Sequence, residues 1–153
     1  MDLDLNELVE RVRRHIGRKG PFCVKTIEKG ALLKFCSAVG ETNPLYVDED
    51  YARTTVYGGL IAPPTYLSAF SEACAGTLVK DLPFTRFLHT DDVIESYLPI
   101  RVGDVITAQG VLADVFAKTG RRGPLLFQAV DITLTNQRDE RVAKITVLTA
   151  HHQ

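Results

Sequence analysis

The order of the apolar patterns along the chain predicts an α+β fold in which one helix packs against an antiparallel sheet. Residues 65–76 are small or apolar on nearly every side, which is typical of a buried helix. After Pro83 the pattern changes to long segments of strand character, separated by turn residues. These segments cover residues 84–100, 104–117, 124–136 and 141–150.

Two further helices are predicted ahead of the buried one. Asp4 has a glutamate three residues on, which is a capping-box pattern, and the apolar stripe that follows ends at Gly17. Thr26 is the predicted cap of the second helix, and Gly40 is its predicted stop. Residues 22–24 form a short extended piece between the two helices.

The segment between the second helix and the buried helix is mostly irregular. Residues 41–61 carry no long periodicity, and Asp48 is expected to cap a short turn. Pro63 and Pro64 lie where proline is best tolerated, in the first turn of a helix. We therefore expect a polar loop that leads into the start of the buried helix.

Size and composition limit the classes of function. A chain of 153 residues suits a single domain with one core. A net charge of −1 and a pI near 6.4 argue against nucleic acid or an anionic membrane surface as a main partner. No apolar run reaches the ~20 residues that a membrane span needs.

Cysteine usage and the first residues predict a cytoplasmic protein. Cys23, Cys36 and Cys74 are odd in number and widely spaced, which favours reduced thiols over disulfides or a zinc site. The acidic first residues do not resemble a targeting segment. Phosphate-loop, metal-ligand and Gly-x-Ser-x-Gly patterns are missing from the sequence, so we expect no metal and no nucleotide site.

The most informative stretch is the loop after the second predicted helix. It contains, in order, Gly40, Glu41, Thr42, Asn43, Pro44, Leu45 and Tyr46, and further on Gly58, Gly59, Ala62, Pro63, Pro64 and Thr65. These pieces resemble the signature of the MaoC-like, R-specific enoyl-CoA hydratase (hydratase 2) family, in the variant of its FAS1-like, N-terminal dehydratase domains. In active members of that family the loop is Gly-Asp-x-Asn-Pro-x-His. Here Glu41 replaces the aspartate and Tyr46 replaces the histidine.

The resemblance covers nearly the whole chain, including residues 88–104 and 118–123. It implies a single hotdog domain over residues 1–153, in which a curved antiparallel β-sheet is wrapped around a central α-helix. It also implies a homodimer or a heterodimer with a catalytic MaoC-like subunit, because a lone curved sheet leaves an edge and a face uncovered. No cofactor is implied beyond the coenzyme A or phosphopantetheine that carries the acyl thioester.

The resemblance also implies roles for individual residues. In this family an aspartate and a histidine of the loop share the proton transfers when water adds across an enoyl thioester, which assigns those roles to Glu41 and Tyr46, with Asn43 beside them. Backbone amides near the helix start would polarise the thioester carbonyl, since such amides favour negative charge. The substrate-binding candidates are Gly58, Gly59, Ala62, Pro64, Thr65 and, facing the acyl tunnel from a strand, His89.

Each candidate also has a plain structural explanation, which the sequence leaves open. Glu41 suits a solvated loop carboxylate, and Tyr46 suits an aromatic side chain packed under the loop. Asn43, before a proline, can bond its own loop backbone. A single strand histidine such as His89 is usually structural. A phenol with a reference pKa of about 10 is also a poor base near neutral pH.

Three functions therefore stay open. The first is a hydro-lyase that interconverts (R)-3-hydroxyacyl and trans-2-enoyl thioesters. The second is a non-catalytic hotdog subunit that forms the acyl-binding half of a heteromeric dehydratase. The third is a hotdog acyl-CoA thioesterase in which Glu41 or a nearby carboxylate activates water at the thioester carbonyl.

The path of the acyl group follows from the small residues of the buried helix, which leave room for a tunnel. We expect the acyl chain to lie over Leu67, Phe70 and Ser71. Enlarging Ala69 or Ala73 is then expected to weaken binding. Arg121 and Arg122, in a glycine-flanked turn, are candidates for phosphate contacts, although an exposed hairpin tip explains them more simply.

Overall fold

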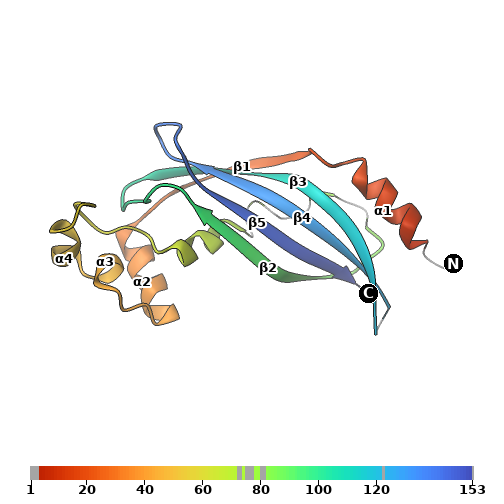
Figure 1. The fold of residues 1–153 in the computed structure, drawn as a ribbon, viewed down its shortest axis with the longest axis horizontal. Coiled ribbons are helices and arrows are strands. Elements are labelled where there is room, and N and C mark those ends of the chain that lie inside the picture. Colours follow the sequence, from red (N-terminus) through yellow and green to blue (C-terminus); the bar gives the residue numbers. More distant parts are fainter. Residues whose placement is uncertain (1–3, 72–73, 75–77, 80–81, 122, 153) are drawn as a thin grey trace.

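The structure, a computed structural model, describes residues 4–71, 74, 78–79, 82–121 and 123–152. The described residues form a five-stranded, curved antiparallel sheet with helices at both of its ends (Figure 1). The strands follow the order β1-β3-β4-β5-β2 across the sheet. Their bounds are β1 Lys19–Thr26, β2 Arg86–Ser96, β3 Val105–Gly120, β4 Gly123–Thr135 and β5 Arg141–His152.

The helices lie at opposite ends of the sheet (Figure 1). α1 covers Leu5–Arg13 and contacts β3 at one end. α2 (Lys29–Val39), α3 (Pro44–Val47) and α4 (Glu49–Arg53) cluster at the other end. A 3₁₀ helix, η1 (Pro64–Phe70), leads from this cluster back to the sheet. No helix in the described part of the chain is long and apolar enough to cross a membrane.

The inner face of the sheet and η1 enclose the main hydrophobic core. Leu67 and Phe70 of η1 are 2% and 1% exposed and pack against this face. Full burial of one such side chain stabilises the fold by about 1.5–3 kcal/mol. Buried and more exposed residues alternate along the long strands, as expected for strands with one buried face. The strands contribute Ile106, Ala108, Leu112, Val115, Leu126, Val130, Ile132, Leu134, Ile145 and Val147.

A second, smaller core lies among the helices at the other end. Its buried members are Leu32, Cys36, Ala52 and Leu60. Phe35 of α2 and Tyr66 of η1 meet edge to face beside them, with ring centroids 5.2 Å apart. This cluster holds α2, α4 and the chain around residue 60 together, and so fixes the loop between α2 and α3.

Three of the predicted helix boundaries are confirmed. The Asp4 carboxylate accepts hydrogen bonds from the amides two and three residues on and so caps α1. Gly40 ends α2 in the left-handed conformation, with φ of 71°, which glycine adopts without strain. The Asp48 carboxylate accepts from the amide of Tyr51 and caps α4.

The predicted cap at Thr26 is wrong. α2 begins at Lys29, and its N-cap is Glu28, whose side chain makes no capping hydrogen bond. Thr26 is instead the last residue of β1 and lies opposite Val105 of β3. Pairing with the neighbouring strand therefore determines the conformation of Thr26, and its capping propensity does not.

The first strand is longer than the predicted extended piece at 22–24. β1 begins at Lys19, and a proline at position 21 obscures its strand pattern. Proline is tolerated here because β1 is an edge strand, and the register with β3 shifts between Lys19 and Phe22.

The strand predicted at 84–100 is shorter in the structure, where β2 ends at Ser96. The amides of Tyr97 and Leu98 both donate to the carbonyl of Val142, so the regular pairing of β2 with β5 stops there. Residues 97–100 then leave the sheet edge. The other three predicted strands, at 104–117, 124–136 and 141–150, agree with β3, β4 and β5 to within three residues at each end.

The buried helix predicted over 65–76 is only partly described. Pro64–Phe70 is a 3₁₀ helix rather than an α-helix. Ser71 and Cys74 are helical and buried. Residues 72–73 and 75–77, and with them Ala73, lie outside the described residues.

His151 on β5 makes stability depend on pH. Burial lowers its pKa from the ordinary value of 6.5, and its ring lies 6.3 Å from that of Phe87. As pH falls through about 6.5, the unfolded chain takes up a proton that the folded chain resists, so the free energy of unfolding should decrease. His151→Gln should reduce this loss between about pH 7 and about pH 5.5 in urea melts. The same substitution at the exposed His15 is the control, and an equal effect there would contradict the assignment.

Candidate functional site

A pocket of about 220 Å³ lies where the helix cluster meets the sheet. Three parts of the chain form its walls: α3, the chain from Tyr57 after α4 to the start of η1, and the end of β2 with the stretch that follows it. The lining residues are Tyr46, Tyr57, Ile61, Ala62, Pro64, Leu67, Ser96, Tyr97, Leu98, Pro99 and Ile100. The pocket is therefore mainly apolar, with three tyrosines and one serine as its polar side chains.

Backbone pairing holds two of these walls together. The amide of Ala62 donates to the carbonyl of Ile100 at 2.8 Å, and the amide of Val102 donates to the carbonyl of Leu60 at 3.2 Å. Between them Ile61 and Arg101 form an isolated antiparallel bridge. The segment before η1 is thus fixed against the segment after β2, although the two are about 40 residues apart in sequence.

The loop between α2 and α3 is stabilised by its own side chains. Oε1 of Glu41 accepts from the amides of Thr42 and Asn43, both at 2.9 Å. Oδ1 of Asn43 accepts from the amide of Leu45 at 3.0 Å and caps α3. Asn43 therefore bonds to its own loop, as its structural explanation expects, and Glu41 does the same as a half-buried side chain rather than as a fully solvated one.

The structure brings three of the predicted site residues together at the pocket. Tyr46, Ala62 and Pro64 line it, and Tyr46 is half-buried and also packs against the smaller core. Five other candidates lie close by in the chain but do not line the pocket. These are Glu41, Asn43, Gly58, Gly59 and Thr65.

The expected carbonyl-polarising amides are partly occupied. The amide of Gly58 donates to the carbonyl of Thr55 at 3.1 Å, and the amide of Ala62 donates to Ile100. Gly58 has φ of 68°, a left-handed conformation that favours glycine. The amides of Gly58 and Ala62 therefore serve the fold in this arrangement.

His89 does not reach the pocket and belongs to a separate polar network. Its Nε2 lies 2.7 Å from Oδ1 of Asp92, and the Ser71 hydroxyl donates to Oδ2 of the same carboxylate at 2.9 Å. This network joins β2 to the helix that follows η1. The structure therefore supports the structural explanation for His89.

The expected acyl path is only partly matched. Leu67 lines the pocket, whereas Phe70 and Ser71 are buried away from it. Ala69 is exposed on the other side of η1, and its carbonyl accepts from Nζ of Lys25.

Sequence reasoning missed the stretch after β2 and Tyr57 as pocket residues. The signal for the first was present, since residues 88–104 resemble the family and Pro99 interrupts a strand pattern. Tyr57 gave no signal, because it lies in a segment without periodicity.

The chemistry available in the pocket is limited. No carboxylate and no imidazole is among the residues that line it in the described part of the chain. Cys36 belongs to the smaller core and does not line the pocket. Burial, with Glu41 nearby, raises the pKa of its thiol, so the thiol stays protonated and supplies no nucleophile. The arrangement can enclose an apolar chain and offer tyrosine hydroxyls, but it holds no base at the pocket wall.

A curved antiparallel sheet that encloses a helix, with an apolar pocket at the helix start, defines a hotdog-fold protein. The model of the FAS1-like dehydratase domain region matches residues 14–145, and the chain belongs to that family. The predicted fold and family are therefore confirmed.

Relatives of this chain include proteins with and without a stated activity. A UPF0336 protein of Streptomyces griseus is 34% identical over 91 residues, 57% of this chain and 61% of that protein. An (R)-specific enoyl-CoA hydratase of Rhodospirillum rubrum is 34% identical over 84 residues, 55% of this chain and 56% of the hydratase. The chain thus spans about three fifths of the length of these relatives, or less.

Solved structures share the fold. A MaoC-like dehydratase superposes with a TM-score of 0.81 at 20% identity, over 93% of this chain and 43% of that one. The HadBC (3R-hydroxyacyl-ACP dehydratase) complex of Mycobacterium tuberculosis gives a TM-score of 0.75 at 17% identity, and the match covers 89% of this chain and 96% of that one. The ChsH1–ChsH2 complex of the same organism gives a TM-score of 0.71 at 18% identity, and the match covers 97% of this chain and 91% of that one.

Proposed function

We propose that this chain is the non-catalytic, acyl-binding half of a heteromeric MaoC-like dehydratase. The observation that carries the proposal is the pocket, which is apolar and has no carboxylate or imidazole among its described lining residues. The partner subunit would supply the acid–base pair, and this chain would hold the acyl thioester.

The state of the loop supports this assignment. The family's histidine position holds Tyr46, which lines the pocket as a phenol. Glu41 has its Oε1 engaged by two amides of its own loop. Two of the structural neighbours, HadBC and ChsH1–ChsH2, are complexes of two different chains by their names.

One of the two sheet edges, the one formed by β2, is the surface where such a partner would pair. β2 is an edge strand, and it exposes large apolar side chains: Phe87 is 71%, Leu88 58% and Val93 54% exposed. Exposed edges with apolar side chains pair readily with another strand. A second strand along β2 would cover this edge and continue the sheet.

A second candidate is a hydro-lyase that acts alone on (R)-3-hydroxyacyl or trans-2-enoyl thioesters. The observation that favours it is that Glu41 retains a carboxylate at the family's acidic position. The chain is also similar to an (R)-specific enoyl-CoA hydratase. The thioesterase alternative gains nothing from the geometry, since it also needs a carboxylate at the thioester carbonyl.

One assay with a matched binding experiment separates the candidates. The purified chain should cause no loss of enoyl absorbance with crotonyl-CoA, yet calorimetry should detect binding of butyryl-CoA. Addition of a MaoC-like subunit with an intact Asp/His loop should give a stable complex that hydrates crotonyl-CoA. Turnover by the pure chain that Glu41→Gln abolishes would instead establish the stand-alone hydro-lyase.

A further inference from the structure

Two arginines stand beside tyrosines that line the pocket. Nε of Arg101 donates to the carbonyl of Tyr57 at 3.2 Å. The guanidinium of Arg141 lies over the ring of Tyr97, 4.9 Å from its centroid, and its Nη2 donates to the Tyr97 hydroxyl at 3.4 Å. Both tyrosines line the pocket, whereas the two arginines are exposed and are not among its lining residues, so each cation lies beside a residue of the pocket wall.

These arginines keep hydrogen-bonding capacity for a ligand. Among the described residues neither Arg101 nor Arg141 forms an ion pair with a carboxylate, whereas Arg138 on the same hairpin pairs with Glu140 at 2.8 Å. The carboxylate of Glu95 accepts from the Tyr97 hydroxyl at 3.1 Å, and that of Asp104 accepts from the backbone amide of Arg101 at 2.8 Å, so neither of these contacts uses a guanidinium. Each guanidinium therefore presents N–H donors that the fold does not consume.

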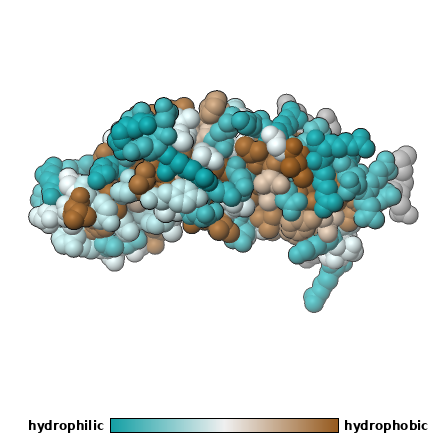
Figure 2. Space-filling model, turned by 45° about the horizontal axis from the view of Figure 1, so that its top comes forward, coloured by the Kyte–Doolittle hydropathy of each residue, from teal (hydrophilic) through white to brown (hydrophobic). Residues whose placement is uncertain are grey.

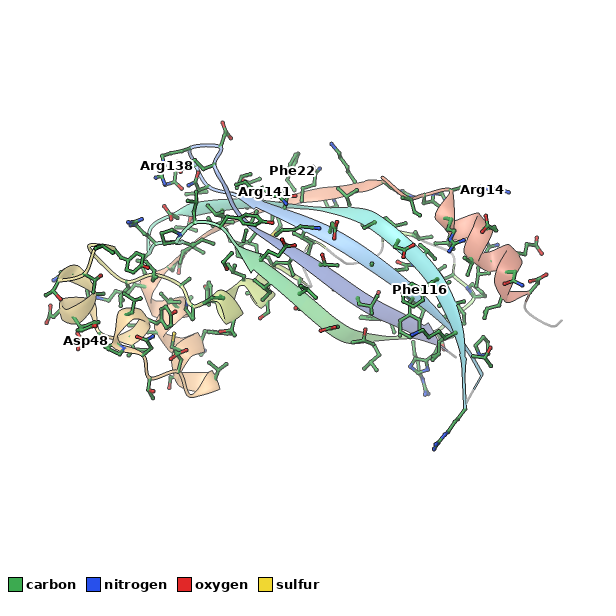
Figure 3. The ribbon with its side chains drawn as sticks, viewed as in Figure 1. Arg14, Phe22, Asp48, Phe116, Arg138 and Arg141 are labelled. Atoms are coloured by element: carbon green, nitrogen blue, oxygen red, sulfur yellow. The ribbon has the colours of Figure 1, made fainter. Side chains whose placement is uncertain are left out.

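The two arginines come from different parts of the chain: Arg101 from the stretch after β2, where it pairs with Ile61, and Arg141 from β5. Arg141 lies at the start of β5, beside the β4–β5 hairpin, and Arg14 lies at the opposite end (Figure 3). Hydrophilic side chains cover the hairpin end of the molecule in the space-filling view (Figure 2). Arg121, the earlier candidate for a phosphate contact, follows β3 at the far end of the sheet, and Arg122 lies outside the described residues.

We propose that Arg101 and Arg141 bind a phosphate of the pantetheine arm that carries the acyl group. The inference rests on the proposed function, because it takes the pocket as the acyl site. Guanidinium groups bind phosphate through parallel N–H donors, and the contacts with Tyr57 and Tyr97 hold the two arginines next to residues that line the pocket. The same phosphate chemistry is offered by coenzyme A and by the phosphopantetheine of a carrier protein.

Three thioesters with the same butyryl group test the proposal: butyryl-CoA, butyryl-phosphopantetheine and butyryl-pantetheine, which has no phosphate. In the wild-type chain the first should bind more tightly than the last, and this advantage should shrink as salt is added. The double variant Arg101→Gln/Arg141→Gln should weaken butyryl-CoA binding by about tenfold and leave butyryl-pantetheine unchanged. Arg14→Gln/Arg18→Gln, at exposed positions of the opposite end, is the matched control for net charge.

The outcomes identify the source of the phosphate. An equal loss for butyryl-CoA and butyryl-phosphopantetheine would assign the arginines to the phosphate that both carriers share. A loss for butyryl-CoA alone would overturn the proposal as stated, because the arginines would then contact nucleotide phosphates that the pantetheine arm does not carry.

Other outcomes overturn the proposal. Equal weakening of all three esters would mean that the arginines only support the tyrosines that line the pocket. No weakening in the double variant would exclude phosphate binding by these arginines. Equal weakening in the Arg14/Arg18 control would exclude it as well. If the wild-type chain bound none of the esters, the proposed function would fail as well. If the wild-type chain bound butyryl-pantetheine but the arginine substitutions changed the binding of none of the esters, only the inference about the phosphate would fail, and the proposed acyl-binding function would stand.

Discussion

Gly110→Ala should destabilise the fold by about 1–3 kcal/mol or more, because an alanine methyl group has no space at this position. A Cβ at Gly110 would lie 2.4 Å from the carbonyl oxygen of Cys74 and 3.0 Å from Cγ1 of Val130. The first neighbour is backbone, so no side chain can rotate away to accept the methyl group. The helix that carries Cys74 would have to move off the sheet.

The matched control is the same substitution at Gly30. This glycine lies in the first turn of α2, and a Cβ there would meet nothing within 4 Å. Gly30→Ala should therefore stabilise the protein by a few tenths to about 1 kcal/mol, since alanine has the higher helix propensity. Urea midpoints at equal m-values measure both changes. A Gly110→Ala protein as stable as the wild type would show that the helix is not packed on β3 as described.

Ala62→Phe should weaken acyl-thioester binding by at least about tenfold, equivalent to about 1.4 kcal/mol. Ala62 lines the pocket between Ile61 and the start of η1, so a phenyl group would occupy the space meant for the acyl chain. The backbone bond from Ala62 to Ile100 does not involve the side chain and should persist. Calorimetry with butyryl-CoA measures the loss, and circular dichroism checks the fold.

Ala69→Phe, on η1, provides the control. Ala69 is exposed and does not line the pocket, so binding should change little there. This reverses the expectation from sequence, which placed the acyl chain beside this residue. If Ala69→Phe weakened binding and Ala62→Phe did not, the acyl site would lie on the other side of η1.

The strands were the part of the fold that the sequence predicted best, because their alternation reflects burial on one face. β4 and β5 show the reason, since their inward positions are nearly all apolar and fully buried. β1 was underestimated because its proline suggested a break, whereas an edge strand tolerates proline. The cap at Thr26 failed because pairing with β3, a contact far away in sequence, overrides local preference.

The site was less predictable, because a motif gives residue types and leaves side-chain direction open. The loop from Gly40 to Tyr46 was found, yet Glu41 bonds to its own backbone while Tyr46 lines the pocket. The wall formed by Tyr97 and Leu98 depends on where β2 leaves the sheet. That point is determined by pairing with β5, which periodicity within one segment cannot show.

The strand order has a consequence for how the chain folds during synthesis. β1 pairs with β3, so that Lys25 meets Ile106, and β2 pairs only with β5, so that Phe87 meets His151. At ~5–20 residues per second, β1 must wait roughly 4–16 s after it is made before its partner exists. β2 cannot complete its pairing until the last residues of β5 are made, because Arg86 at its start pairs with His152. During this interval the exposed apolar side chains of both edge strands, such as Phe22 and Phe87, are open to association with other chains, which a chaperone or an early partner subunit would limit.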